Sequence, residues 1–139
     1  MDTKEKVVEK LRSKGLKITP QRLAIIETLE GNRNHPSAED VYKELSQRYP
    51  TISYATIYKT LETLCELGEL MEVNIEPHKK RYDPFTEPHH HFRCVNCGKI
   101  EDIPLEEVPV PPVSDEVQEK YGIVRMCVYF YGFCPACKN

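Results

Sequence analysis

The sequence predicts an α+β protein of 139 residues, in which a helical N-terminal domain precedes a smaller domain built mainly from short strands. The first observation is hydrophobic spacing: apolar residues recur at helical intervals in residues 4–67 and alternate with period two in residues 70–75. The second observation is two Cys-x-x-Cys pairs, at residues 94–97 and 134–137. Four thiolates with this spacing are typical of a structural zinc site, which helps a domain of this size to fold.

The first two predicted helices are separated by a turn at Gly15. The first covers residues 4–14, and Gly15 is placed to end it in a left-handed conformation. Thr19 is a good N-cap for the second helix, and Pro20 takes the first helical position, where its missing N–H costs no hydrogen bond. The side chains expected to be buried on these helices are Val7, Val8, Leu11, Leu23, Ile26 and Leu29.

Two further helices are predicted after the turn at residues 32–36. Ser37, with Asp40 three residues later, matches a capping box that begins the third helix, and Ser53 caps the fourth. The side chains expected to face inward are Val41, Tyr42, Leu45, Ile57, Leu61 and Leu64. The outward face of the fourth helix then consists of Tyr54, Tyr58, Lys59 and Glu62. Its tyrosine and lysine side chains suit contacts with DNA.

A basic two-stranded hairpin is predicted next, because residues 70–75 alternate between apolar and polar and residues 79–82 follow a turn at residues 76–78. Helices followed by such a wing predict a winged helix-turn-helix domain over residues 1–82. An ordinary small helical bundle with tyrosines on its rim is the alternative.

Charge is distributed unevenly along the chain. The net charge of −3 argues against a nucleic-acid partner for the chain as a whole. Residues 1–82, however, carry 14 lysines and arginines against 13 acidic residues, whereas residues 83–139 carry 5 against 9. Seven basic residues fall within residues 1–22, against three acidic ones. We therefore expect any contact with an anionic polymer at the N-terminal end, although a solvated helix face explains the same run.

Residues 83–88 predict a hinge, and residues 89–139 predict the second domain. Its expected elements are a histidine-containing strand, a strand over residues 100–103, a Pro-rich passage over residues 104–112, a brief helix capped by Ser114 and a strand over residues 123–131. The last strand is apolar on both faces apart from Arg125. In so small a domain, two apolar faces suggest that one of them meets another chain.

Three consecutive histidines begin this domain. In a strand, His89 and His91 point to one face and His90 to the other. Imidazole and carboxylate ligands suit an exchangeable Fe(II), Mn(II), Zn(II) or Ni(II) ion, so we expect a second site besides the four thiolates. The alternatives are a His-rich surface strand for the histidines, and disulfides or redox motifs for the cysteines. The sequence contains no apolar leader or membrane-spanning run, so we expect a cytoplasmic protein with reduced thiols.

Five motifs, in this order, resemble the ferric uptake regulator family. They are Gly15–Arg22, His35–Tyr42, Ala55–Leu61, His89–His91 and the two Cys-x-x-Cys pairs, so the resemblance covers nearly the whole chain. It implies a homodimeric, metal-dependent repressor that is not an enzyme and binds double-stranded DNA, at an AT-rich palindromic operator. Each subunit is then a winged-helix domain (1–82), a hinge (83–88) and a zinc-stabilised α/β dimerisation domain (89–139).

The resemblance also implies roles for individual residues. The structural zinc ligands are Cys94, Cys97, Cys134 and Cys137. The ligands of a regulatory Fe(II) or Mn(II) ion are His35, Asp83, His89, His91 and Asp102. The residues implied to contact DNA are Lys17 in the minor groove, Arg22 on phosphate, and Tyr54, Tyr58 and Lys59 on the major-groove helix.

Aspartates at positions 83 and 102 resemble the peroxide-sensing branch of the family, because the iron-uptake branch tends to have glutamates there. The resemblance then implies sensing by iron-catalysed oxidation of a histidine ligand, His35 or His89. Alternatives are a repressor that senses the level of iron, manganese or zinc, and, more remotely, a non-haem iron enzyme. A zinc-stabilised protein-interaction module leaves His35 and Asp83 without a role.

Overall fold

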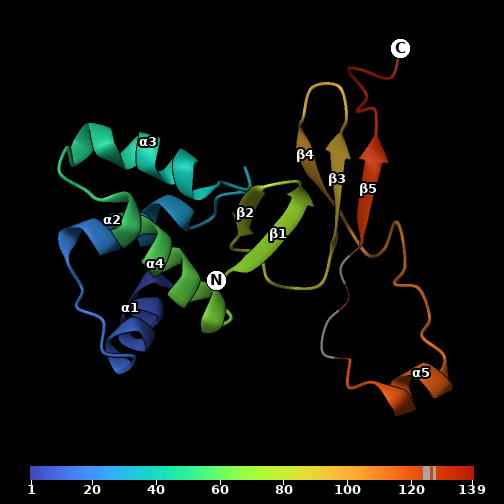
Figure 1. The fold of residues 1–139 in the computed structure, drawn as a ribbon, viewed down its shortest axis with the longest axis horizontal. Helices are drawn as coiled ribbons and strands as arrows, with labels where there is room; N and C mark the ends of the chain where they lie inside the picture. The colour runs from blue at the N-terminus through green and yellow to red at the C-terminus, as the bar shows by residue number, and fades with distance from the viewer. Residues whose placement is uncertain (124–125, 127) are drawn as a thin grey trace. The chain divides into compact units, whose positions relative to one another are not determined.

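The computed structural model describes residues 1–123, 126 and 128–139, which divide into two compact units, Met1–Thr86 and Glu87–Asn139. The first unit contains α1 (Lys4–Ser13), α2 (Pro20–Leu29), α3 (Ala38–Arg48), α4 (Tyr54–Glu66), β1 (Met71–Glu76) and β2 (Lys79–Asp83) (Figure 1). The second contains β3 (His90–Cys94), β4 (Ile100–Ile103), α5 (Asp115–Lys120) and β5 (Tyr129–Gly132). The predicted α+β class is confirmed. Among the described helices, none combines the length and apolar composition that crossing a membrane requires.

The predicted N-caps begin their helices as expected. The side-chain oxygens of Thr19 and Ser53 accept hydrogen bonds from the backbone three residues later. Ser37 and Asp40 form both halves of a capping box at the start of α3. After α1, Gly15 adopts φ +80°, the left-handed conformation in which glycine ends a helix without steric strain. These local hydrogen bonds fix where α2, α3 and α4 begin.

The four helices of the first unit bury one apolar core. Its fully buried side chains include Val7, Leu11, Ile25, Ile26, Leu29, Val41, Ile57, Leu61 and Leu64. Three expected core residues, Val8, Leu23 and Tyr42, are not fully buried. Val8 is half-buried and packs against the core. Leu23 is half-buried, because a helix turns about 100° per residue and the buried arc of α2 is shared by Ala24, Ile25 and Leu29. Tyr42 is exposed, with its ring packed edge-on against the ring of Tyr54 at a centroid distance of 5.9 Å. This packing leaves the Tyr42 side chain at the surface of α3.

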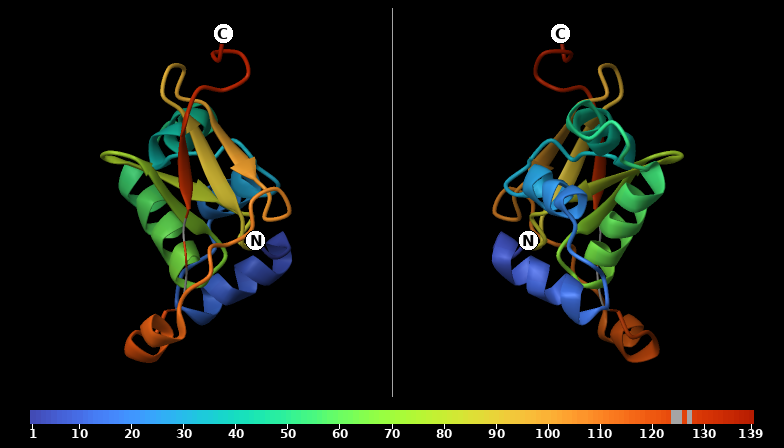
Figure 2. Two further views of the ribbon diagram at one scale, coloured as in Figure 1. Left: turned by 90° about the vertical axis from the view of Figure 1, so that its right-hand side faces the viewer. Right: turned by 90° about the vertical axis from the view of Figure 1, so that its left-hand side faces the viewer.

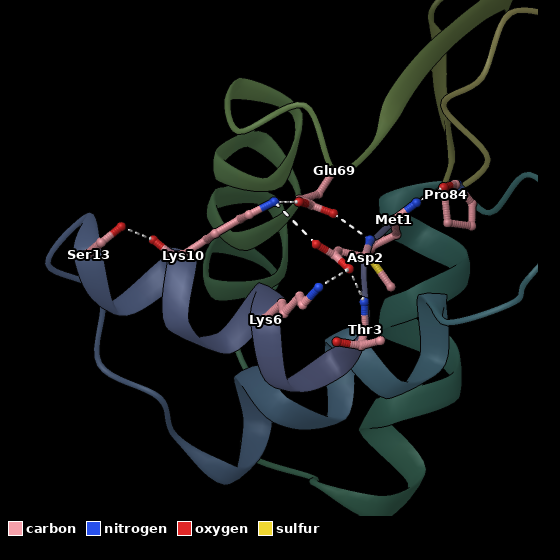
Figure 3. A network of polar contacts seen from close by, with 8 residues as sticks. All are labelled: Met1, Asp2, Thr3, Lys6, Lys10, Ser13, Glu69 and Pro84. Atoms are coloured by element: carbon pink, nitrogen blue, oxygen red, sulfur yellow. Dashed lines mark hydrogen bonds and ion pairs between the residues drawn. The ribbon is translucent and has the colours of Figure 1, made fainter.

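The hairpin of β1 and β2 is antiparallel, with Met71 opposite Asp83. Asp83, expected to begin the hinge, is instead the last residue of β2. Glu69 lies between α4 and β1 and is buried, and its carboxylate accepts hydrogen bonds from the Asp2 backbone (2.7 Å) and from the Lys10 ammonium (Figure 3). These two bonds join the start of the chain to the segment that leads into the hairpin.

The sheet of the second unit has the strand order β4-β3-β5 (Figure 2). β3 pairs antiparallel with β4 and parallel with β5, so that His91 lies between Asp102 and Tyr129. The strand expected over residues 123–131 is shorter, because its partner β3 begins only at His90 and pairs β5 from Tyr129 onward. Of that expected strand, Val124, Arg125 and Cys127 lie outside the described residues.

Candidate metal centres

The four predicted zinc ligands meet at one end of the β3-β5 pair. The Sγ atoms of Cys94, Cys97, Cys134 and Cys137 lie within 4.8 Å of one another. Parallel pairing places Cys94 opposite Gly132, which brings the turn after β3 beside the segment after β5. Gly98 takes φ +78° in that turn, a conformation that favours glycine.

The electrostatics of this cluster fit a divalent cation. The backbone N–H groups of Cys97 and Cys134 donate to Cys94 Sγ at 3.4 Å each, and these bonds lower the pKa of the Cys94 thiol to about 6. For Cys137, a hydrogen bond with Asn96 lowers the pKa, but the neighbouring thiols and burial together raise it to about 11. The Cys94 thiol therefore ionises readily, whereas its neighbours disfavour ionisation of Cys137. A zinc ion removes that conflict, because it stabilises four thiolates at once.

A second cluster in the same unit contains two imidazoles and a carboxylate. The Nε2 atoms of His89 and His91 lie 3.3 and 3.5 Å from Asp102 Oδ1, and 3.1 Å from each other. The Nδ1 of His89 lies 2.7 Å from the carbonyl oxygen of Glu87, which assigns the proton to Nδ1 and a lone pair to Nε2. Two imidazole nitrogens this close beside a carboxylate need a proton or a cation between them. The donor set fits Fe(II), Mn(II) or Zn(II).

His90 faces away from this cluster, as its place in the strand predicts. Its Nε2 lies 2.7 Å from the Val108 carbonyl oxygen, and its ring packs edge-on against Phe130 at a centroid distance of 5.9 Å. The Pro-rich passage thus contacts the side of β3 that lacks the clustered imidazoles. His90 is a structural histidine.

The first unit contains an imidazole–carboxylate pair of its own. His35 Nε2 lies 3.5 Å from Asp83 Oδ2, and both residues are almost fully buried, at 2% and 1% exposed. The other oxygen of Asp83 accepts a hydrogen bond from the Phe85 backbone at 2.9 Å. His35 precedes α3 and Asp83 ends β2, so the fold joins two segments that are distant in sequence. One imidazole and one carboxylate supply about half of the protein ligands of a typical non-thiolate metal site.

The residues expected to contact DNA lie at the surface of the first unit, with one exception. Tyr54 and Tyr58 are 43% and 41% exposed on α4, and Lys17 and Lys59 are also exposed. Arg22 is half-buried, and its Nη1 donates to the Lys17 carbonyl oxygen at 2.7 Å. Arg22 therefore holds the backbone of the segment that presents Lys17.

Arg81 was not predicted from the sequence to have a role near His35. It belongs to a run of three basic residues that predicts a uniformly charged wing. In the structure its guanidinium group contacts Glu76 of β1 and the carbonyl oxygen of His35. The sequence gives a weak signal for the contact with Glu76, because an acidic residue lies across the hairpin turn from Arg81. It gives no signal for the contact with His35.

Comparisons with known proteins agree with this arrangement. The model of the ferric uptake regulator family matches residues 13–131. The peroxide-responsive repressor PerR of Staphylococcus epidermidis is 34% identical over 97% of this chain and 90% of its own length. The peroxide operon regulator of Bacillus subtilis is also 34% identical, over 97% of this chain and 93% of its own length. The crystal structure of the Campylobacter jejuni peroxide stress regulator is 34% identical and superposes with a TM-score of 0.69, covering 94% of this chain and 98% of that one. The chain therefore belongs to the ferric uptake regulator family.

Proposed function

We propose that this protein is a metal-dependent, DNA-binding transcriptional repressor that responds to peroxide. The observation that carries the proposal is that each unit contains its own imidazole–carboxylate cluster, separate from the four thiols. The peroxide-responsive relatives support the same function. In this proposal the protein acts on DNA in the cytoplasm, and repression needs no enzymatic turnover of a substrate.

The two clusters are proposed to bind one regulatory ion together. Its ligands would be His35, Asp83, His89, His91 and Asp102. An ion that engages both units selects conformations in which the units are held at one angle, which is a population shift by differential binding. Losing one ligand would therefore release DNA without unfolding either unit.

Peroxide sensing follows from the same ligand set. His35 and His89 are among the residues that would hold Fe(II). The bound ion would supply a one-electron reductant for peroxide, and one of these two imidazoles would be the target of the resulting oxidant. Mn(II) is a poor reductant of peroxide, so it should support DNA binding and resist peroxide. The four thiols, engaged as zinc thiolates, should be slower targets than the histidines.

The second unit is proposed to form a homodimer. Its edge strand β5 and the following residue expose large aromatic side chains, with Tyr131 at 56% and Phe133 at 57% exposed. An exposed apolar edge of this kind favours pairing with another chain. A symmetric dimer with one α4 per subunit suits a palindromic, AT-rich operator read in the major groove.

The proposal is tested by fluorescence anisotropy of the zinc-loaded full chain on an AT-rich palindromic duplex, with Mn(II), with Fe(II) under anaerobic conditions, and without added metal. Both ions should promote binding. A brief peroxide exposure should abolish binding of the iron-loaded protein alone, and mass spectrometry should find added oxygen on His35 or His89.

The manganese-loaded protein treated with the same peroxide is the matched control. Loss of binding with oxidised cysteines and unmodified histidines would move the sensing to the thiols. If the iron-loaded protein kept its DNA after peroxide, the protein would instead be a sensor of metal level. Equal DNA binding with and without metal would contradict the metal-dependent repressor.

A further inference from the structure

The guanidinium group of Arg81 lies among three segments of the first unit. Its Nε lies 2.5 Å from Glu76 Oε1 on β1, and its Nη1 donates to the His35 carbonyl oxygen at 3.0 Å. The same Nη1 lies 3.7 Å from Asp40 Oδ2, the oxygen that closes the capping box of α3. The Arg81 side chain is 17% exposed. The Arg81 side chain therefore points into the first unit, whereas a wing residue that contacts DNA is expected to point outward.

The segment that carries His35 is attached to β2 by its backbone as well. Ser37 forms an antiparallel bridge with Arg81, and the Tyr82 N–H donates to the Pro36 carbonyl oxygen at 2.9 Å. His35 itself has φ +50°, a left-handed conformation that is uncommon for residues other than glycine. Such a conformation persists only where its surroundings hold it. The hydrogen bond from Arg81 is made to the carbonyl group of this residue.

We propose that Arg81 is a positioning residue for the regulatory metal site: it holds the backbone of His35 so that the imidazole faces Asp83. The inference rests on the proposed function, in which His35 and Asp83 bind a divalent ion. It adds a residue that touches neither the ion nor any ligand atom. The same guanidinium group also lies beside the α3 capping box and contacts Glu76 on β1. Arg81 therefore links the segment that carries His35 to α3 and to the β1-β2 hairpin.

The geometry requires arginine. A planar guanidinium group donates in several fixed directions, whereas a lysine ammonium is a compact point charge at the end of a flexible chain. Lysine at position 81 can keep an ion pair with Glu76. Its single ammonium group cannot at the same time donate to the His35 carbonyl oxygen in the geometry that the guanidinium group provides. Loss of outer partners of metal ligands typically weakens metal binding by roughly 10–100-fold.

The test is the Mn(II) dissociation constant of the zinc-loaded full chain, measured by electron paramagnetic resonance. Arg81→Lys and Arg81→Gln should each weaken Mn(II) binding by about tenfold or more. Lys80→Gln is the matched control, because Lys80 is the adjacent basic residue and pairs with Glu72 at 3.3 Å. It should leave the Mn(II) affinity unchanged.

A second measurement separates positioning from a general loss of structure. In the zinc-loaded protein without Mn(II), the ring ¹⁵N resonances of His35 should move in Arg81→Lys, while the zinc content stays at the wild-type value. If Arg81→Gln does not fold, Arg81→Lys carries the test, and Glu76→Gln serves as a second control. Glu76→Gln keeps an acceptor for Nε and leaves the bond to His35, so it should bind Mn(II) nearly as wild type does.

His35→Ala distinguishes failure of this inference from failure of the proposed function. If His35→Ala binds Mn(II) as tightly as wild type, the proposed regulatory site is wrong. If His35→Ala weakens binding while both Arg81 variants match wild type, the role of Arg81 alone is overturned. Equal weakening by Lys80→Gln and Arg81→Gln, with Arg81→Lys binding as wild type does, would also overturn it, because the effect would then reflect charge on the hairpin.

Discussion

Glu69 is a buried carboxylate that accepts hydrogen bonds from two donors. It is 4% exposed, and it accepts from the Asp2 backbone and the Lys10 ammonium group, which also lies 3.7 Å from Asp2 Oδ2 (Figure 3). Burial alone raises the pKa of Glu69, but these hydrogen bonds and the charge of Lys10 hold it below its ordinary value of 4.5. The ionised form therefore stabilises the fold at neutral pH.

Glu69→Gln should lower the free energy of unfolding by about 1–3 kcal/mol, because it removes the charge of a buried carboxylate that accepts hydrogen bonds from the Asp2 backbone and from the exposed Lys10 ammonium. Urea denaturation at pH 7 measures the change, with the exposed Glu66→Gln on α4 as control. The folded-state pKa is lowered, so the stabilisation is present above about pH 4.5 and is lost as the pH falls through the folded-state value. The difference between wild type and Glu69→Gln should therefore shrink in acid. A constant difference between pH 7 and pH 3 would contradict this assignment.

At the scale of the element, α4 combines a buried face with an exposed one. Ile57, Leu61 and Leu64 are fully buried, while Tyr58 and Lys59 are exposed, because they lie about 100° and 200° around the helix from Ile57. The apolar face fixes the helix in the unit and leaves its outer side chains to bind DNA in the proposed function. Substitutions on the outer face should therefore change DNA binding with little effect on stability.

Tyr58→Ala should weaken binding to the specific operator more than binding to random duplex, because base contacts specify and phosphate contacts do not. Arg22→Ala should weaken both, by loss of a phosphate contact or of the bond that holds Lys17. For Arg22→Ala, the slope of the logarithm of the binding constant against the logarithm of salt concentration should become shallower by about one unit per lost phosphate contact. Anisotropy titrations at several salt concentrations measure both effects. Wild-type operator affinity in Tyr58→Ala would show that α4 does not read the operator.

Contacts between residues close in the sequence could be predicted, whereas contacts between distant residues could not. The caps at Thr19, Ser37 and Ser53 were predictable because each bonds a backbone group three residues away. The Cys-x-x-Cys pairs were predictable for the same reason. The bonds from Arg81 to His35 and from Lys10 to Glu69 join residues 46 and 59 positions apart. No periodicity or spacing encodes such contacts, because the packing of whole elements creates them.

At the scale of the whole molecule, the second unit has little apolar core of its own. Among its described residues the buried hydrophobic side chains are Cys94 and Cys134, both members of the thiol cluster. Small domains of this kind depend on a metal for folding, and structural zinc contributes on the order of 10 kcal/mol or more. A zinc ion bound by the four thiols, as proposed, would therefore hold the fold of this unit together.

Cys94→Ser and Cys137→Ser should each yield a protein that has lost zinc and is unfolded in its second unit or monomeric. Elemental analysis and size-exclusion chromatography with light scattering measure both properties. Lys138→Gln, next to the cluster and exposed, is the control and should remain zinc-loaded. A stable, zinc-free dimer of either cysteine variant would contradict a structural role for the metal.

β3 carries a ligand of the proposed regulatory ion at His91 and a zinc ligand at Cys94, three residues further along the same strand. A strand rises about 3.3 Å per residue, which separates the two positions by roughly 10 Å. The two clusters also have no residue in common. In the proposed function, loss or exchange of the regulatory ion therefore removes no ligand from the four-thiol cluster.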